Sequence, residues 1–260
     1  MQSLSIIVVT YNDSKFILPC LRELRDSINQ TGVVLTVIDN NSSDRTKQLI
    51  KNNFPTIPLV ELKENIKLSR ALNLGAKMFP AKKYLFLNPD VLIKYSEVQE
   101  LAQFMDTDEK LGIIGPKLVY PDGSIQYSCR QFPNLWNVLL RGFGFTEDKK
   151  FMPKSLHRYL MTEYDHITPT AVDWILLACL MVKNETMTGL EGFDKKLPLY
   201  YNDMDFCWRA WKKGWGVMYY PKIKIVHYYQ RSSEKNLIFN RSKWSHFFSA
   251  VRFLIKKNFL

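Results

Sequence analysis

Carboxylates that follow apolar runs are the side chains of this sequence best suited to chemistry. Asp90 stands in the tripeptide Asn88-Pro89-Asp90, directly after the apolar run Tyr84–Leu87. A carboxylate there can hold a divalent cation, because hard cations take oxygen ligands and keep waters and phosphate oxygens around them. The alternative is an Asx-Pro turn that only ends a strand. The tripeptide alone does not decide between the two.

A second acidic residue, Asp39, follows the apolar run Val33–Ile38 and opens a polar run that extends to Asp44. Acidic side chains at this place in nucleotide-binding sheets accept hydrogen bonds from the bound nucleoside. The polar run also fits a turn that caps the next helix. The two interpretations are compatible.

Two further carboxylates, Asp203 and Asp205, lie in the first turn of a helix predicted over Asp203–Lys213. Acidic groups are stabilised there by the helix dipole and by capping, so a structural role is one interpretation. The other is that one carboxylate faces the ligand cleft as a general base.

His227 and Trp174 each allow a structural and a functional interpretation. His227 follows the apolar run Ile223–Val226, where a packed, hydrogen-bonded histidine is the alternative to a ligand. Trp174 stands beside Asp173 in a predicted strand, and it fits either the core or a flat apolar face on which a sugar stacks.

The elements that must position these residues alternate between apolar strands and helices. Apolar runs without alternation, separated by helices, indicate a parallel sheet that is covered on both faces. Ligands of such sheets lie beyond the carboxyl ends of the strands, and polar residues stand at these ends here. The expected strands are Ser5–Val9, Val33–Ile38, Leu59–Leu62 and Tyr84–Leu87, and the expected helices are Ser14–Ile28, Arg45–Asn53 and Ser69–Met78.

The second half of the chain is more irregular. A β-hairpin is predicted around the turn Pro121–Gly123, from Ile113–Tyr120 to Ser124–Ser128. Further expected strands are Trp174–Val182, Val217–Tyr220 and Ile223–Val226. In the tail, Leu237, Trp244, Phe248, Val251 and Ile255 fall on one helical stripe.

Composition limits the class of protein. The 260 residues are 46% hydrophobic and 23% charged, which excludes a disordered or collagenous chain. The net charge of +11 favours anionic partners such as phosphorylated ligands, nucleic acid or an acidic membrane surface.

Four scattered cysteines make a disulfide framework or zinc site improbable and favour a reducing cytosol. The most apolar stretch, Ala171–Val182, is shorter than the roughly 20 residues of a membrane span. The N-terminus is expected to be a strand and not a signal peptide.

Taken in order, these segments resemble glycosyltransferase family 2, a family of inverting enzymes with the GT-A fold. Several segments look most like bacterial rhamnosyltransferases of O-antigen and related polysaccharide assembly. The segments that carry the resemblance are SIIVVTYN, VIDNNSSD, NIKLSRALNLG, YLFLNPDV, VDWILLACLMVKNETMTGLEGFD, LYYNDMDFCWRAWKKG and YYPKIKIVHYYQRSS.

The resemblance implies an α/β fold and a role for each matching residue. The fold would be a Rossmann-like, mostly parallel sheet flanked by helices, with residues 1–115 binding the nucleotide-sugar, 116–230 binding the acceptor and 231–260 forming a basic amphipathic tail. Asp203 would be the catalytic base, and Asp90 and His227 would hold Mg²⁺ or Mn²⁺. The nucleotide-sugar would contact Thr10, Tyr11, Asn12, Asp39, Asn73, Asn88 and Asp90, and the acceptor side would include Asp173, Trp174 and Asp205.

The implied partners are a nucleotide-sugar, with dTDP-rhamnose expected, and a lipid-linked or oligosaccharide acceptor. The basic tail is expected to contact the cytoplasmic face of the inner membrane, or to pack in a homodimer. Nucleic acid is not an expected partner, and the expected location is the cytoplasm.

Two positions depart from the family pattern. Asn88 replaces the first acid of the metal motif, and Asn202 replaces the glutamate that usually precedes the base. Three alternatives therefore stay open. They are the same fold with another donor, a related protein that has lost activity, and a non-catalytic basic protein that binds membrane or nucleic acid.

Overall fold

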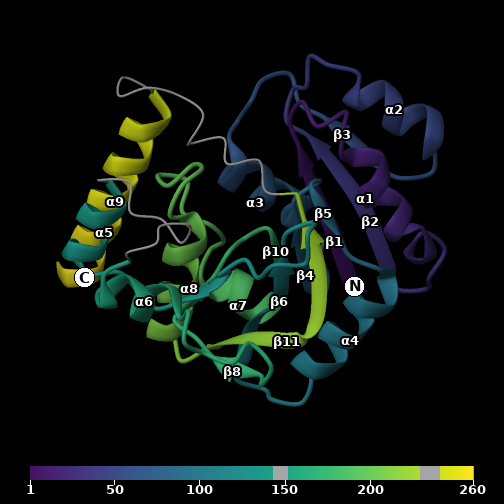
Figure 1. Cartoon of the computed structure of the whole chain (residues 1–260). Coiled ribbons are helices and arrows are strands. Elements are labelled where there is room, and N and C mark those ends of the chain that lie inside the picture. Colours follow the sequence, from purple (N-terminus) through teal and green to yellow (C-terminus); the bar gives the residue numbers. More distant parts are fainter. Residues whose placement is uncertain (143–151, 229–240, 260) are drawn as a thin grey trace.

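One large mixed sheet lies at the centre of the molecule (Figure 1). The computed structural model describes residues 1–142, 152–228 and 241–259. The sheet order is β3-β2-β1-β4-β10-β6-β11-β5, with β8 also paired to β11. Its strands are β1 (Gln2–Thr10), β2 (Val33–Asp39), β3 (Leu59–Glu61), β4 (Ala81–Leu87), β5 (Val91–Leu92), β6 (Leu111–Val119), β8 (Thr170–Ala171), β10 (Cys179–Lys183) and β11 (Gly216–His227).

Helices pack on both faces of the sheet, as the unbroken apolar strands predict. Within β1, Ile7 and Val9 join the core under α3, whereas Ile6 and Val8 join the core under α1, α2 and α4. The helices described are α1 (Ile17–Glu23), α2 (Thr46–Asn53), α3 (Leu68–Met78), α4 (Tyr95–Met105), α5 (Leu135–Gly142), α6 (Lys154–Leu160), α7 (Asn184–Gly189), α8 (Asn202–Lys212) and α9 (Arg241–Phe259), with a 3-10 helix η1 (Arg25–Ser27).

Strand direction confirms the predicted mostly parallel α/β sheet. β1 pairs in parallel with β2 and β4, β2 with β3, and β6 with β11. β10 is antiparallel to both β4 and β6. The strands β1, β2 and β4 therefore end at one edge of the sheet, with Thr10 directly opposite Asp39.

Several predicted strands differ in the structure. The expected strand Trp174–Val182 is broken into β9 (Trp174–Ile175) and β10, because Leu176–Ala178 turn away from the pairing. β9 pairs instead with β7 (Cys129–Arg130) in a separate two-stranded sheet. The expected hairpin after Gly112 has only a single bridge, Val119 to Ile125, opposite β6.

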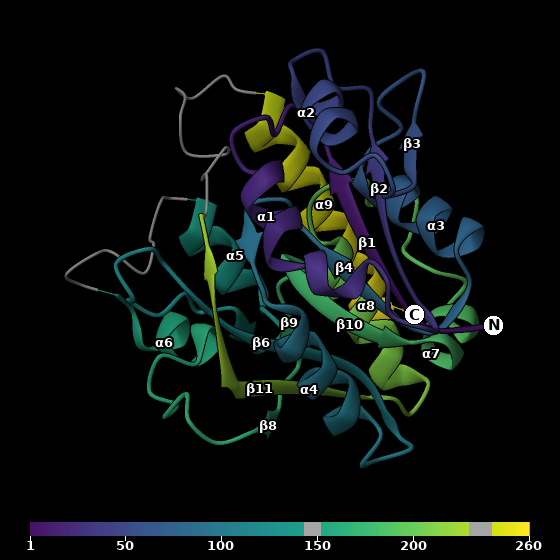
Figure 2. The same cartoon turned by 90° about the vertical axis from the view of Figure 1, so that its right-hand side faces the viewer.

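The two short strands expected near the C-terminal end are one strand, β11, which bends sharply along its length (Figure 2). Its register with β6 shifts between Tyr220 and Lys224. The expected boundary at residues 115 and 116 falls inside β6, so the two predicted halves share one sheet. Of the predicted tail stripe, Leu237 and the side chain of Trp244 lie outside the described residues. Among the helices described, none combines the length and apolarity that a bilayer crossing requires.

Candidate active site

The turn after β1 is held by Asp13, a residue that the sequence analysis missed. Its Oδ2 accepts hydrogen bonds from Thr10 Oγ1 at 3.0 Å and from the Tyr11 backbone N–H at 2.8 Å. Asn12 has a φ of 61°, and its Oδ1 accepts from the Ser43 N–H at 2.8 Å. The turn is thereby fixed to the loop after β2, which brings the predicted residues Thr10, Tyr11 and Asn12 beside Asp39.

Asp39 is fully buried, and only one of its two carboxylate oxygens accepts a hydrogen bond from the described residues. Its Oδ1 accepts a hydrogen bond from the Ser42 N–H at 2.9 Å, whereas Oδ2 has no hydrogen-bond partner among the described residues. An unsatisfied buried carboxylate oxygen is costly. A bound molecule that offers an N–H or O–H at this point would remove that cost.

Asp90 and His227 come together through strand pairing. β5 pairs with the end of β11 so that Val91 lies opposite His227, and the Tyr228 N–H donates to the Asp90 carbonyl at 2.8 Å. Asp90 Oδ1 lies 3.4 Å from His227 Nε2 and, among the described residues, receives no hydrogen bond. Cis ligands of an octahedral cation with bonds near 2.1 Å lie about 3 Å apart. This donor pair therefore fits a divalent cation.

Within the described residues, side chains supply only part of the shell of such a cation. No group of three histidine, cysteine, aspartate or glutamate side chains is placed to hold a metal in the part of the chain described here. Asp90 and His227 would supply two ligands, and hard cations commonly complete their shells with water and substrate phosphates.

Asp203 faces the break between β9 and β10. Its Oδ2 accepts from the Leu177 N–H at 3.3 Å and its Oδ1 from the Met204 N–H at 2.9 Å. Burial raises the pKa of the Asp203 carboxyl, while these two N–H donors and the charge of Arg130 act to lower it. A carboxyl with a raised pKa suits general-base chemistry.

The same short break connects Asp203 with the Asn88-Pro89-Asp90 turn. Leu177 donates to Asp203, and the next residue, Ala178, accepts a hydrogen bond from the Asn88 N–H at 2.9 Å. Two residues beyond Asn88 stands Asp90. Asp203 and Asp90 are therefore connected through Leu177, Ala178 and Asn88.

The residues predicted on the acceptor side lie mostly inside the protein. Trp174 is buried, its Nε1 donates to the Gln131 carbonyl at 2.9 Å, and Arg130 lies 5.3 Å from its ring centre. These contacts support the interpretation of Trp174 as a core residue, and they do not support an open face on which a sugar stacks. Asp173 Oδ2 accepts from the Phe132 N–H at 2.6 Å.

Asn73 and Asn202 connect elements within the protein. The Asn73 amide both donates to the Phe193 carbonyl and accepts from the Phe193 N–H, each at 2.8 Å. The buried Asn202 donates to Ser69 Oγ at 3.2 Å, and that hydroxyl donates to the Leu197 carbonyl. A glutamate at position 202 would lack the N–H that donates to Ser69 Oγ. The asparagine that departs from the family pattern is therefore used in a hydrogen bond within the protein.

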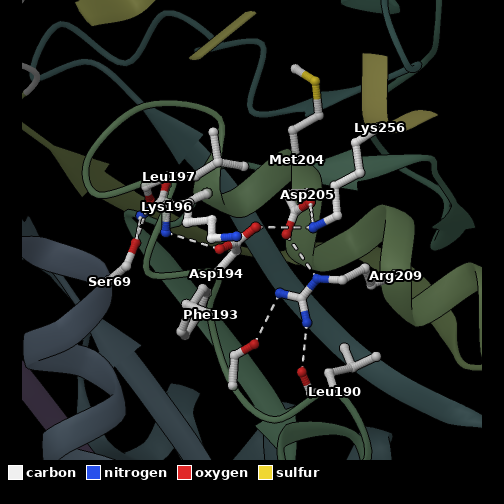
Figure 3. Close-up of polar contacts among 12 residues, drawn as sticks. Ser69, Leu190, Phe193, Asp194, Lys196, Leu197, Met204, Asp205, Arg209 and Lys256 are labelled. Carbon is white, nitrogen blue, oxygen red and sulfur yellow. Dashed lines mark hydrogen bonds and ion pairs between the residues drawn. The ribbon is translucent and has the colours of Figure 1, made fainter. Parts of the chain in front are cut away.

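Asp205, in the first turn of α8, lies in an ion-pair network (Figure 3). It is fully buried, with Oδ2 2.8 Å from Arg209 Nε and Oδ1 2.6 Å from Lys256 Nζ. Lys256 also contacts Asp194 at 3.1 Å. Since both oxygens are engaged within the protein, these contacts do not support the acceptor-side position predicted for Asp205. They fix α9 against the start of α8.

Residues 5–161 match glycosyl transferase family 2. The chain belongs to this family. It is therefore a glycosyltransferase with the GT-A fold, which confirms the resemblance noted in the sequence.

Curated relatives include rhamnosyltransferases. The chain is 26% identical over 246 residues to the N-acetylglucosaminyl-diphospho-decaprenol L-rhamnosyltransferase of Mycobacterium tuberculosis, covering 90% of this chain and 78% of that protein. It is 25% identical over 179 residues to the rhamnosyltransferase WbbL of Escherichia coli, covering 68% of this chain and 62% of that protein.

Solved structures with the same fold include two with bound ligands. Staphylococcus aureus TarS in complex with UDP is 17% identical with a TM-score of 0.57, over 86% of this chain and 60% of that one. The mannosyltransferase PcManGT from Pyrobaculum calidifontis, in complex with GDP-Man and Mn²⁺, is 18% identical with a TM-score of 0.59, over 97% of this chain and 65% of that one. The chain thus spans about three fifths of the length of these structures.

The Asp205 network gives a stability prediction. Asp205→Asn removes the carboxylate that Arg209 and Lys256 share, which leaves Lys256 with Asp194 and Arg209 with backbone carbonyls alone. Breaking such a buried ion pair costs about 3 kcal/mol in the free energy of unfolding. The measurement is urea unfolding followed by circular dichroism. The control is Asp26→Asn, whose pair with Arg25 is solvent-exposed and is worth less than about 1 kcal/mol. Equal effects of the two substitutions would contradict the structural role of the network.

Proposed function

We propose that the protein is an inverting glycosyltransferase that moves L-rhamnose from dTDP-rhamnose onto a hydroxyl of a glycan or lipid-linked saccharide. The observation that carries the proposal is the junction at Leu177 and Ala178, which ties the base candidate Asp203 to the turn that holds Asp90. The donor sugar is inferred from the names of two relatives, an L-rhamnosyltransferase and a rhamnosyltransferase. The acceptor class is inferred from the first of them, whose name includes a diphospho-decaprenol.

The nucleoside would lie at the ends of β1 and β2. The unsatisfied Oδ2 of Asp39 suits an N–H of the base, and the exposed ring of Tyr11 stands in the turn beside it. Thr10 and Asn12 would shape this pocket through the hydrogen bonds that fix the turn. A base that offers an N–H at that position, such as the N3–H of thymine, would satisfy Asp39.

The diphosphate would lie near Asp90 and Asn88, where Asp90 and His227 would hold Mg²⁺ or Mn²⁺. When bound, this cation supplies positive charge against the charge that develops on the leaving diphosphate. The presence of Mn²⁺ in the structurally similar mannosyltransferase supports a divalent cation in this fold.

Asp203 would take the proton from the acceptor hydroxyl as that oxygen attacks the anomeric carbon. The two backbone N–H groups from Met204 and Leu177 hold the carboxylate in place. A single base serves one in-line displacement, which inverts the anomeric centre, whereas double displacement uses a second carboxylate as nucleophile.

Replacing the base tests the proposal directly. Asp203→Asn should lower the rate of rhamnose transfer by about 10²-fold or more, because the acceptor loses its general base, while dTDP binding is retained. Transfer is followed by release of dTDP, and binding by calorimetry. The control is Asp108→Asn, since Asp108 precedes β6 at the opposite edge of the sheet. Full activity of Asp203→Asn would reject the base assignment.

The pH dependence of transfer provides a second test. A general base must be deprotonated to act. Because the pKa of Asp203 is raised above the ordinary aspartate value near 3.9, kcat/KM should fall as the pH is lowered through this raised pKa. Arg130→Met removes a positive charge that lowers this pKa, and it should move the acid limb to higher pH. Arg25→Met, at an exposed pair, should not move it. An acid limb that Arg130→Met leaves in place would contradict the assignment.

Helices α5 and α9 carry exposed apolar side chains suited to contact with lipid. Helices α5 and α9 lie side by side at the left of Figure 1. The opposite stripe of α9, with Ala250 and Phe253, is buried, so α9 is apolar on two faces. We call the exposed set the outer apolar face; it comprises Leu135, Trp136 and Leu139 of α5 with Phe248, Val251 and Ile255 of α9.

The occupant that we propose for this face is an anionic membrane surface. The tail from 231 to 260 contains seven Lys or Arg residues and one Glu. Lys256 is paired with Asp194 and Asp205. Each of the other basic residues that lies near such a surface would contribute about 1 kcal/mol of binding free energy. Apolar side chains that project among basic ones are typical of interfacial helices.

Vesicle binding tests this surface. The double substitution Trp136→Ser and Phe248→Ser should reduce co-sedimentation with vesicles containing anionic phospholipid several-fold, because both side chains lose their insertion into the interface. Met78→Ser, at an exposed methionine of α3, serves as the control. Binding that is unchanged in the double variant, or a dimer by sedimentation velocity that the double variant dissociates, would contradict the membrane proposal.

A further inference from the structure

Gln126 is a buried polar residue that no part of the sequence analysis singled out. It follows the bridge between Val119 and Ile125, and its backbone N–H donates to the Leu118 carbonyl at 3.0 Å. Its carbonyl in turn accepts from the Ser128 N–H at 2.7 Å. The side chain is 4% exposed, so its amide depends on protein partners for its hydrogen bonds.

Both ends of the Gln126 amide contact His227. Nε2 donates to the His227 backbone carbonyl at 2.8 Å, and Oε1 lies 2.8 Å from His227 Nδ1. The reverse orientation of the amide would place Oε1 against a carbonyl oxygen, with two acceptors in contact. The backbone of His227 therefore determines which atom of the amide faces the imidazole ring.

This orientation determines the tautomer of the imidazole. Because Oε1 is an acceptor, Nδ1 must carry the hydrogen. In neutral histidine the other nitrogen, Nε2, then has a lone pair, and Nε2 is the atom that faces Asp90 Oδ1 at 3.4 Å. Two electron-pair donors that face each other at this distance are stabilised by a cation that both can bind.

We propose that Gln126 is a positioning residue that holds His227 in the Nδ1–H tautomer, so that Nε2 is ready to bind a divalent cation together with Asp90. Histidine ligands in proteins generally donate their second N–H to an outer partner, and loss of that partner weakens metal affinity by about 10- to 100-fold. The inference rests on the proposed function, because the metal site belongs to it.

Two substitutions separate positioning from packing. Gln126→Met keeps the length of the side chain but removes the acceptor for Nδ1–H, so it should weaken Mn²⁺ binding by about 10- to 100-fold. Gln126→Glu in its neutral form keeps an acceptor for Nδ1–H and an O–H donor for the His227 carbonyl, so it should leave the Mn²⁺ affinity within a few-fold of the wild-type value. A role in packing alone predicts no such rescue, since Gln126→Glu introduces an ionisable group into a buried site.

The measurement is a titration of Mn²⁺ in the presence of dTDP, with free Mn²⁺ followed by electron paramagnetic resonance. Nitrogen-15 NMR of the imidazoles, without metal, reports the tautomer independently. The chain has four histidines, and His227→Gln identifies the signals of His227. Wild type should show a protonated Nδ1 and an unprotonated Nε2, and Gln126→Met should increase the Nε2–H form. Thermal unfolding of each variant verifies that it is folded.

The outcomes distinguish the inference from the proposed function. Unchanged Mn²⁺ affinity in folded Gln126→Met, or an Nε2–H tautomer in wild type, would overturn the role of Gln126 and leave the glycosyltransferase proposal intact. Absence of Mn²⁺ binding by the wild type in the presence of dTDP would overturn both the metal site and this inference.

Discussion

The backbone between β9 and β10 is the constraint on which the arrangement of the site depends. Within two consecutive residues, Leu177 donates to Asp203 and Ala178 accepts from Asn88. One side of this segment is the start of α8, and the other is the end of β4. A regular strand through residues 174–182 would use these N–H and carbonyl groups in sheet pairing. The break leaves them available to connect the two acidic parts of the site.

The site contains carboxylate oxygens that the protein does not satisfy. Asp39 Oδ2 and Asp90 Oδ1 are buried without a hydrogen bond from the described residues, at or just beyond the ends of β2 and β4, the two strands that flank β1. By contrast, both oxygens of Asp205 are engaged by Arg209 and Lys256, as expected for a carboxylate with a structural role. This difference is consistent with the proposal that Asp39 and Asp90 bind a ligand, whereas Asp205 stabilises the fold.

Sequence pattern predicted the features that depend on local order and on the geometry of parallel sheets. Apolar runs that end in polar residues were sufficient to place Thr10, Asp39 and Asp90 at one edge, because parallel strands end together. The pattern could not show the break at Leu176–Ala178, since the run from Trp174 to Val182 is apolar throughout. The roles of Asp13 and Gln126 were missed for a related reason. Each depends on which turns the fold brings into contact, and neither residue type is distinctive in a loop.

A crystal structure with Mn²⁺ and dTDP would show whether Asp90 and Asp203 serve one ligand. We expect an anomalous peak for Mn²⁺ between Asp90 and His227, with the thymine at Asp39 and the Asp203 carboxylate facing the open side of the diphosphate. A metal bound elsewhere, or a nucleotide seated away from Asp203, would contradict the shared site.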